Sequence, residues 1–492
     1  MRPNIIQIVV DDMGVGDLSA FNKQRSQTYR LDFLMEEGVA CAQQYSSSAV
    51  CMPARASLMT GLYPQRVGTV DYPHHRPWDY CDPQVLTLPA HLAANGYQTG
   101  CLGKWHLGSG PMHPARRGFD ETLTFEGSMS DYWSWTLHYN GLVPKPADGR
   151  YLTDVLTDEA VSYVCRHRNE PFYLYLAYNA PHTPYQAHEE DVDFFRKAGL
   201  FNESVCQLYA MLRAVDRGIE RILDTLDRLG LSENTLVWFT SDNGAVQNDR
   251  MRRSNGNMRG GKCSVWEGGI RVPSIVRWPA GGIAGGRICD DLLHFTDLPV
   301  TLCEAAEAPW AERTDGRNVL GALQGKAEQA APKRFWQWTH FGVQPMHNAA
   351  VRDGKWKLVS PACGGYVVNA PSQDLFGLDS QMLANTEDAA DSGVPLPAGF
   401  ADHAAYRDYL FETLQAPRPD VKNYPPLKTE LFDLEVDPAE NNDLSEQHPE
   451  IADRLRHDLE GWFAEVMPEA ESHRAADPYG VLAQTEGAPG QT

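Results

Sequence analysis

The strongest constraint on the fold is a series of short apolar runs, each of which ends abruptly in polar residues. The runs occupy residues 5–10, 99–102, 172–178 and 236–240, and the patterns between them, at 88–95, 153–167 and 205–230, are helical. Runs of about four to seven apolar, β-branched or aromatic residues without alternation are typical of strands buried on both faces of a sheet. Strands that alternate with helices predict an α/β fold with a large, mainly parallel sheet flanked by helices.

The length and a change of pattern near residue 345 predict two domains. A chain of 492 residues with 42% hydrophobic and 22% charged residues is typical of a soluble globular protein too large for a single core. We assign residues 1–345 to a catalytic domain and 346–475 to a smaller α+β domain with an antiparallel sheet, followed by a flexible tail at 476–492. In the smaller domain we expect a hairpin turning at Asp353-Gly354, strands at 365–368 and 430–434, an insertion at 369–428 and a helix at 445–466.

The net charge and the cysteines exclude several classes of function. A formal net charge of −22 opposes binding to nucleic acid or to an anionic membrane, because both require a basic face. None of the ten cysteines forms a C-x-x-C pair, so neither a zinc ribbon nor a thioredoxin-like site is expected. The first four residues lead directly into an apolar run and leave no room for a signal peptide. The sequence therefore predicts a cytoplasmic protein, or a periplasmic or secreted one if a leader preceded Met1.

Oxygen ligands follow two of the apolar runs. Asp11 and Asp12 come directly after the first run, and Asp242 and Asn243 follow the last. The carboxyl ends of parallel strands lie at one edge of the sheet, where ligands of α/β proteins bind. Three carboxylates packed together would repel each other unless a cation lay among them, and oxygen ligands select a hard ion such as Ca²⁺ or Mg²⁺. The alternative is that the first pair only caps a helix and the second only turns the chain.

Cationic side chains follow other runs or lie in a glycine-rich segment. They are Arg55, Lys104, His106, His182 and Lys262. A lone histidine or lysine after a strand usually forms an ordinary hydrogen bond or faces water. Together, these groups could surround a tetrahedral oxyanion while a metal binds its other oxygens. The two sets of residues indicate sulfuryl or phosphoryl transfer.

Cys51 is the candidate nucleophile. It lies at the predicted start of a helix, with Pro53 in the first turn and Arg55 on the same face. A thiol beside a guanidinium at a helix N-terminus is expected to ionise easily. The alternative is a buried structural cysteine. A cysteine-dependent phosphatase is excluded, because its loop has the pattern C-x5-R and this chain has Ser57 at the arginine position.

The pattern C-x-P-x-R at 51–55, followed by ASLMTG at 56–61, resembles the signature of the type I sulfatases. The resemblance extends along nearly the whole chain, through DDMGVGD at 11–17, GKWHLG at 103–108, APHTP at 180–184, SDNGA at 241–245, GGKCSVWEGGIRVP at 260–273 and LFDLEVDPAENNDL at 431–444. The order and spacing of these motifs are very specific. The resemblance implies an arylsulfatase-like sulfuric ester hydrolase with the alkaline phosphatase-like α/β sandwich and a smaller C-terminal sheet domain.

In that family a formylglycine-generating enzyme oxidises the cysteine to formylglycine, and the resemblance implies the same for Cys51. The hydrated aldehyde would attack sulfur and form a covalent sulfo-enzyme intermediate, and its second hydroxyl would then expel sulfate. The matching motifs imply one divalent metal, with Ca²⁺ expected and Mg²⁺ or Mn²⁺ as alternatives. The implied ligands are Asp11, Asp12, modified Cys51, Asp242 and Asn243.

The remaining motif residues receive roles in the same way. The resemblance implies that Arg55 and Lys104 hold the modified residue and the sulfate. It implies that His106 takes the proton of the second hydroxyl. His182 and Lys262 would contact the leaving-group oxygen, with His182 as the general acid.

The substrate would be a small-molecule or saccharide sulfate ester, but the motifs do not define its pocket. Aromatic residues in the segments 69–83, 126–140 and 335–347 are candidates for stacking on an aryl or sugar group, or for ordinary core packing. They are His74, His75, Trp78, Tyr132, Trp133, Trp135, His138, Trp336, Trp338, His340 and His347. A homo-oligomer is compatible with the sequence.

Two other functions stay open at this point. One is a phosphate or phosphonate monoester hydrolase on the same fold, and the other is a catalytically inactive homologue that only binds anions. The residue after Asp242 is Asn243 rather than histidine, which by the resemblance favours the calcium sulfatases.

Overall fold

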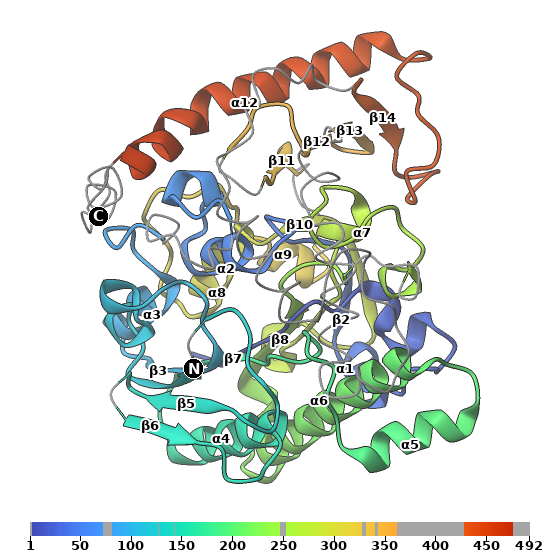
Figure 1. Cartoon of the computed structure of the whole chain (residues 1–492). Helices are drawn as coiled ribbons and strands as arrows, with labels where there is room; N and C mark the ends of the chain where they lie inside the picture. The colour runs from blue at the N-terminus through green and yellow to red at the C-terminus, as the bar shows by residue number, and fades with distance from the viewer. Residues whose placement is uncertain are drawn as a thin grey trace, which may run out of the picture.

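Two sheets organise the chain in the computed structural model (Figure 1). The larger has ten strands in the order β10-β2-β9-β8-β1-β7-β3-β4-β5-β6, and the smaller has four in the order β11-β12-β13-β14. The structure describes residues 2–71, 81–125, 127–141, 143–246, 252–326, 331–339, 343–361 and 428–475. In these ranges no helix combines the length and the apolar character needed to cross a bilayer. The predicted fold class, a mainly parallel sheet with helices and a smaller antiparallel sheet, is confirmed.

The centre of the larger sheet is parallel, and its edges are mixed. Its strands are β1 (Asn4–Val10), β2 (Val39–Tyr45), β3 (Gln98–Lys104), β4 (Glu121–Phe125), β5 (Thr136–Tyr139), β6 (Val143–Pro146), β7 (Phe172–Ala177), β8 (Thr235–Ser241), β9 (Ser274–Arg277) and β10 (Arg287–His294). Strands β8, β1, β7, β3 and β4 run parallel, whereas β9 is antiparallel to both of its neighbours. The four predicted runs form β1, β3, β7 and β8. These strands are buried almost throughout because helices cover both faces.

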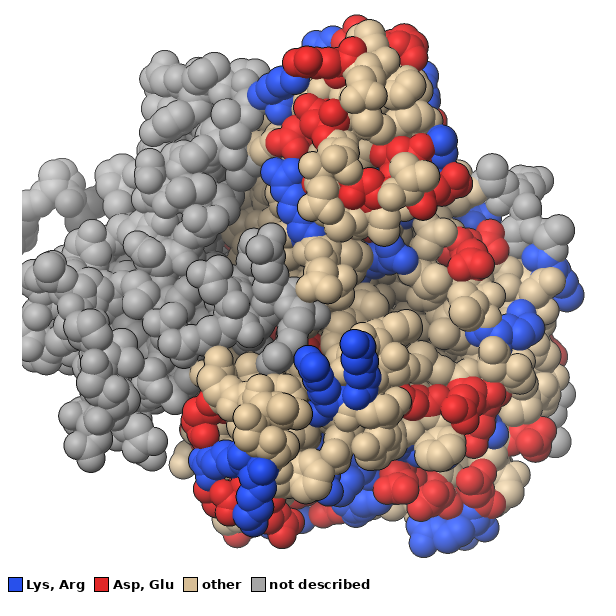
Figure 2. Space-filling model, turned by 90° about the vertical axis from the view of Figure 1, so that its right-hand side faces the viewer, with Lys and Arg blue, Asp and Glu red and all other residues tan. Residues whose placement is uncertain are grey.

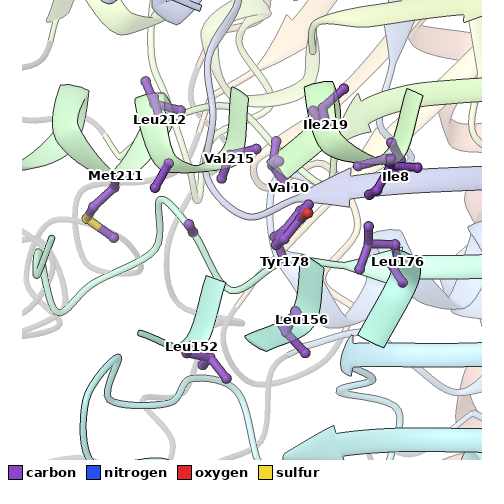
Figure 3. Packing of buried hydrophobic residues seen from close by; sticks show 14 of the residues in the cluster. Ile8, Val10, Leu152, Leu156, Leu176, Tyr178, Met211, Leu212, Val215 and Ile219 are labelled. Carbon is purple, nitrogen blue, oxygen red and sulfur yellow. The ribbon is translucent and has the colours of Figure 1, made fainter. Parts of the chain in front are cut away.

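Two layers of helices pack on the larger sheet. The helices of this part are α1 (Tyr29–Glu37), α2 (Cys51–Thr60), α3 (Leu88–Ala94), α4 (Leu152–Arg166), α5 (Glu189–Ala198), α6 (Glu203–Arg228), α7 (Glu267–Ile270), α8 (Asp297–Ala305) and α9 (Leu320–Leu323). Alternate side chains of β1 enter two different cores. Ile8 packs with Leu156 of α4 and Val215 of α6 (Figure 3). Ile5 and Val9 pack on the opposite face, in the core shared with α2, α3 and α8.

The predicted helices at 88–95, 153–167 and 205–230 correspond to α3, α4 and α6. Helix α6 begins where Oδ1 of Asn202 accepts the backbone N–H of Val205 at 3.1 Å, an N-cap that satisfies one of the free donors of the first turn. An apolar stripe with helical spacing continues from this point to Leu226 and is buried. Capping and periodicity together therefore account for the length of this helix.

The smaller sheet lies under the long C-terminal helix (Figure 1). Its elements are β11 (Arg334–Gln337), β12 (Ala349–Asp353), β13 (Trp356–Ser360), β14 (Glu430–Asp433) and α12 (Pro449–Ala475). The predicted hairpin is present, since Asp353 pairs with Trp356 and Gly354 adopts a φ of 58° in the turn. Strand β11 belongs to this sheet although it precedes residue 345, where the sequence pattern changes.

Some predictions lie outside the described residues. They are the strand at 365–368, nearly all of the insertion at 369–428, and the tail at 476–492. Helix α12 continues past the predicted end at residue 466. On the face shown in Figure 2, acidic and basic side chains are interspersed among the described residues rather than gathered by sign.

Candidate active site

The candidate residues meet at the carboxyl ends of four neighbouring strands, β8, β1, β7 and β3. Asp11 and Asp12 follow β1, Asp242 and Asn243 follow β8, Lys104 ends β3, His182 lies in the loop after β7, and Cys51 begins α2. All of these side chains are buried, and so are those of Arg55, His106 and Lys262. Contacts or short distances connect nine of the ten predicted site residues, and His106 lies at the same edge of the sheet, two residues after β3.

Asp12 is the centre of one half of the site. Its Oδ2 accepts a hydrogen bond from Nζ of Lys262 at 2.8 Å and lies 3.6 Å from Nε2 of His182. Its Oδ1 accepts a hydrogen bond from Nδ2 of Asn243 at 2.7 Å. The backbone N–H of Asp12 donates to Oδ1 of Asp242 at 3.2 Å, which joins the ends of β1 and β8. Although burial opposes it, the charge of Lys262 and its hydrogen bond hold the pKa of Asp12 at about 2.

The other half of the site contains two further carboxylates, each beside a buried cation. Nζ of Lys104 donates to Oδ2 of Asp11 at 2.5 Å. Arg55 donates to Oδ2 of Asp242 through Nη2 at 2.7 Å and Nε at 3.0 Å. Burial and the negative charge of Asp242 raise the pKa of Asp11 to about 8, more than Lys104 lowers it. The two cations therefore leave part of the carboxylate charge uncompensated.

The donor set fits a divalent cation. The atoms Oδ1 of Asp11 and Oδ1 of Asn243 are buried and accept no hydrogen bond from the described residues. One oxygen from each of Asp11 and Asp242 and the sulfur of Cys51 lie within 4.8 Å of one another. A second group with the same spacing comprises Asp11, Asp12 and His182. Carboxylate and amide oxygens without donors are what a hard cation requires, and such an ion would also offset the cost of burying three carboxylates.

Cys51 does not have the ionised thiol that the sequence predicted. Its side chain is 3% exposed at the first residue of α2. Burial raises the pKa of Cys51 more than the nearby charges of Lys104 and Lys262 lower it. The guanidinium of Arg55, which was expected to activate the thiol, instead donates to Asp242. The prediction of an easily ionised thiol is therefore wrong, and the unmodified side chain is neutral.

Arg55 is held by the protein on several sides. Besides its two hydrogen bonds to Asp242, its Nη1 donates to the carbonyl of Lys104 at 3.0 Å and to the hydroxyl of Tyr175 at 3.3 Å. These contacts link α2 to β3, β7 and the end of β8. Arg55 thus fixes the carboxylate of Asp242, and its contact with a sulfate stays a prediction. Tyr175 was missed because a tyrosine within an apolar strand run is indistinguishable from a core residue.

His182 is neutral and has a defined tautomer. Its Nδ1 lies 2.7 Å from the carbonyl of Thr183 and donates to it, which leaves the lone pair on Nε2, the atom that faces Asp12. Burial, with a further effect from the cation of Lys262, lowers the pKa of His182 to about 3. Lys262 has the opposite shift: although burial opposes it, Asp12 holds the pKa of this lysine well above its usual value.

His106 lies two residues after β3, on the same side of the sheet as the other groups. Its backbone has a φ of 55°, in the left-handed region, and its side chain is buried. A histidine tolerates this conformation better than most residues. Its assignment as a base stays a prediction.

Four of the aromatic candidates for substrate stacking are core residues. Tyr132, Trp135, Trp336 and Trp338 are each no more than 2% exposed. The hydroxyl of Tyr132 donates to the carbonyl of His182 at 2.8 Å, so this tyrosine supports the loop that carries the histidine. Ordinary packing, the alternative left open by the sequence, is correct for these four residues. His74, His75, Trp78 and His340 lie outside the described residues.

Comparison with known proteins agrees with this geometry. The family model described as Sulfatase matches residues 3–308. An N-acetylgalactosamine-6-sulfatase of Canis lupus familiaris is 33% identical over 389 residues, which cover 69% of this chain and 72% of that protein. An arylsulfatase of Hemicentrotus pulcherrimus is 28% identical over 506 residues, covering 97% and 82%.

A solved structure extends the similarity to the whole chain. The crystal structure of Ps i-CgsB in complex with k-i-k-neocarrahexaose superposes with a TM-score of 0.75 at 26% identity and covers 99% of this chain and 100% of that one. The family model alone spans more than half of the residues. The protein therefore belongs to the sulfatase family and is an enzyme that hydrolyses sulfate esters.

Proposed function

We propose that the protein hydrolyses sulfate monoesters with a formylglycine derived from Cys51 as the nucleophile. The observation that carries this proposal is the position of Cys51, which begins α2 inside the C-x-P-x-R pattern and lies within 4.8 Å of oxygens of Asp11 and Asp242. A buried neutral thiol is a poor nucleophile. A geminal diol at the same place offers one hydroxyl for attack and a second for release of the product. Maturation would require a formylglycine-generating enzyme as a partner.

In the proposed reaction, one hydroxyl of the hydrated formylglycine attacks sulfur, its proton passes to a carboxylate oxygen of Asp11 or Asp242, and the bond from sulfur to the ester oxygen breaks. His182 gives a proton to the departing oxygen through Nε2, because its Nδ1–H is bound to Thr183. The negative charge of a sulfate ester beside the imidazole favours its protonated form, against the effect of burial and of Lys262. His106 then takes the proton of the second hydroxyl, sulfate leaves, and the aldehyde forms again. Lys262 would neutralise charge on the leaving-group oxygen.

The cation would be held by Asp11, Asp12, Asp242 and Asn243, together with a hydroxyl of the modified Cys51. When bound, it supplies positive charge that balances the buried carboxylates and attracts the oxygens of the sulfate. Ca²⁺ suits this donor set best, because it tolerates many oxygen ligands in flexible geometry. Arg55 orients the carboxylate of Asp242 and Lys104 orients that of Asp11, each through hydrogen bonds.

Removal of the cation should reduce thermal stability as well as activity. In metal-free protein the pKa of Asp11 is raised from 3.8 to about 8, so its ionised form is disfavoured by folding and its contribution to stability falls as pH rises through that interval. A bound cation favours the ionised form of Asp11, so it offsets the loss of stability at high pH. The increase in Tm on addition of Ca²⁺ to chelated protein should therefore be larger at pH 9 than at pH 6. Saturation at about 100 times the Kd stabilises the fold by about 2.7 kcal/mol. Full activity and an unchanged Tm in metal-free protein would contradict the site.

The substrate class is proposed to be a sulfated saccharide or aryl sulfate. Relatives described as N-acetylgalactosamine-6-sulfatase and arylsulfatase, and a structural neighbour solved with neocarrahexaose, support these two classes. Which of them the natural substrate represents depends on the pocket around the site, and Trp133, 37% exposed, is the most exposed of the described aromatic candidates.

The alternative of a phosphate or phosphonate ester hydrolase has a direct test. We expect para-nitrophenyl sulfate to be turned over with a larger kcat/KM than para-nitrophenyl phosphate, since Asn243 supplies a neutral amide oxygen at the position after Asp242. The measurement is the ratio of the two kcat/KM values for the same preparation, with Cys51→Ala as the blank. A ratio that favours the phosphate ester would replace the proposed reaction with the alternative.

A further inference from the structure

The segment that carries Lys262 rests on a buried charge cluster contributed mainly by the smaller sheet. Lys357 of β13 has no exposed surface, and its Nζ lies 2.9 Å from Oε1 of Glu267 and 2.8 Å from Oε1 of Glu440. Glu267 is the first residue of α7, and Glu440 lies in the loop after β14. Both carboxylates are fully buried as well. A lysine from one sheet is therefore shared by two carboxylates from different parts of the chain.

Glu440 also holds the backbone of α7 directly. Its Oε2 accepts the backbone N–H of Glu267 at 2.6 Å. The other oxygen of Glu267 accepts the hydroxyl hydrogen of Tyr45 at 2.7 Å, and a guanidinium nitrogen of Arg271 lies 3.6 Å away. Three of the four carboxylate oxygens thus accept a hydrogen bond in the cluster, and Oε1 of Glu440 has the ion pair with Lys357. A change at Glu440 would release the start of α7.

Helix α7 connects the charge cluster to the active site through close backbone contacts. The backbone N–H of Gly268 donates to the carbonyl of Arg259 at 2.8 Å, and that of Gly244 donates to the carbonyl of Gly269 at 3.0 Å. A Cβ on Gly269 would lie 1.9 Å from the carbonyl oxygen of Ser264, so the turn packs backbone against backbone. One side of α7 therefore supports the loop of Lys262, and the other supports the residue after Asn243.

Asn348, just before β12, holds the same loop at a second point. Its Oδ1 accepts the backbone N–H of Val265 at 3.1 Å, and its Nδ2 donates to the carbonyl of Cys263 at 2.9 Å. Cys263 is the neighbour of Lys262 and has a φ of 73°. This left-handed backbone conformation is unfavourable for a residue other than glycine, so the surrounding contacts must hold it in place. The side chain of Asn348 is 2% exposed.

We propose that Glu440 and Asn348 are positioning residues for Lys262. They hold the backbone that follows this lysine, and the hydrogen bond from Gly268 to Arg259 ties that backbone to the residues before it, so that the ammonium group stays against Asp12 and the leaving-group oxygen. The smaller sheet thereby takes part in catalysis although none of its described residues lies in the catalytic cluster. This inference rests on the role of Lys262 proposed above.

A double-mutant cycle tests the inference. The variants are Glu440→Ala, Lys262→Ala and the double variant, assayed with para-nitrophenyl sulfate and with an alkyl sulfate. Displacement of a catalytic group by about 1 Å can cost about 100-fold, so Glu440→Ala should lower kcat on the alkyl ester by about 10- to 100-fold with little change in KM. In the Lys262→Ala background the same change should cost less than about twofold, because the group being positioned is absent.

Conservative and distant variants separate positioning from loss of fold. Glu440→Gln keeps an oxygen for the N–H of Glu267 and should retain most of the activity. Arg454→Ala removes an exposed ion pair with Asp353, elsewhere in the smaller domain, and should keep wild-type kinetics. If Glu440→Ala does not fold, Asn348→Ala takes its place in the cycle, with the same coupling expected.

The outcomes are distinct. If Glu440→Ala lowers kcat by the same factor in the wild-type and the Lys262→Ala backgrounds, the role of Glu440 is merely structural and the inference is overturned. The proposed function would still stand in that case, because Lys262→Ala alone would have lowered kcat. Wild-type kinetics in Glu440→Ala and Asn348→Ala would overturn it too. Wild-type kinetics in Lys262→Ala would reject the proposed role of that lysine, and the inference with it.

Discussion

Replacement of Cys51 by alanine is expected to abolish turnover of sulfate esters and to leave the fold intact. Alanine has the highest helix propensity, and Cys51 begins α2 with a small buried side chain. The loss of this small polar group should therefore cost only about 1 kcal/mol of unfolding free energy. Activity, by contrast, depends on an oxygen nucleophile that alanine cannot provide. We therefore expect activity to fall to the uncatalysed background.

The matched control is Cys206→Ala. Cys206 is also a buried helical cysteine, but it lies in α6, in the core on the other face of the sheet. Each variant shortens one small buried side chain in a helix, so both should keep a Tm near the wild-type value, whereas only Cys206→Ala should keep wild-type activity. Full activity in Cys51→Ala would disprove the mechanism.

Mass spectrometry gives a second, independent reading of the same prediction. In protein made together with the modifying enzyme, the peptide that contains residues 46–61 should weigh about 18 Da less than its thiol form. Protein made without that enzyme should keep the thiol mass and should be inactive, since burial raises the pKa of Cys51 and the thiol stays neutral. Equal activity in the two preparations would show that the thiol itself suffices.

The central strands and longest helices were predictable because their signals are local. Strand β8 is an unbroken apolar run, and α6 combines an N-cap at Asn202 with a long apolar stripe. Strand β9 has only four residues and pairs with strands that are distant in the sequence, and nothing local encodes such a pairing. The same reason explains why β11 was not placed in the smaller sheet.

The site was predictable where chemistry follows directly after a strand. Asp11 and Asp242 come at the ends of buried runs, and parallel pairing brings such ends together. The ionisation of Cys51 was predicted wrongly, because a sequence shows its neighbours but not the burial that dominates its pKa. Lys357 and Glu440 were missed because each looks like an ordinary surface charge, and only the packing of the two sheets buries them.

The two histidines should respond differently to the leaving group. If His182 protonates the departing oxygen, His182→Ala should lose most activity on alkyl or sugar sulfates, whose alcohols are poor leaving groups. General acid catalysis is typically worth about 10²–10⁴-fold. A nitrophenolate needs little protonation, so the same variant should lose far less on para-nitrophenyl sulfate. His167→Ala is the matched control, since His167 pairs with Glu121 at the start of β4, at the opposite edge of the sheet from the site, and should show no dependence on the leaving group.

His106 acts after the leaving group has departed, so its removal should slow every substrate that reaches the sulfated enzyme. The intermediate should then accumulate, visible as about 80 Da added to the hydrated form of the peptide of residues 46–61, or about 98 Da above its aldehyde form. Running His182→Ala and His106→Ala against leaving groups of graded pKa separates the two roles. A steeper dependence for His182→Ala, with the adduct trapped only in His106→Ala, is the expected result. Equal slopes, or the adduct in His182→Ala, would reverse the assignment, because a base that releases sulfate cannot sense a group that has already left.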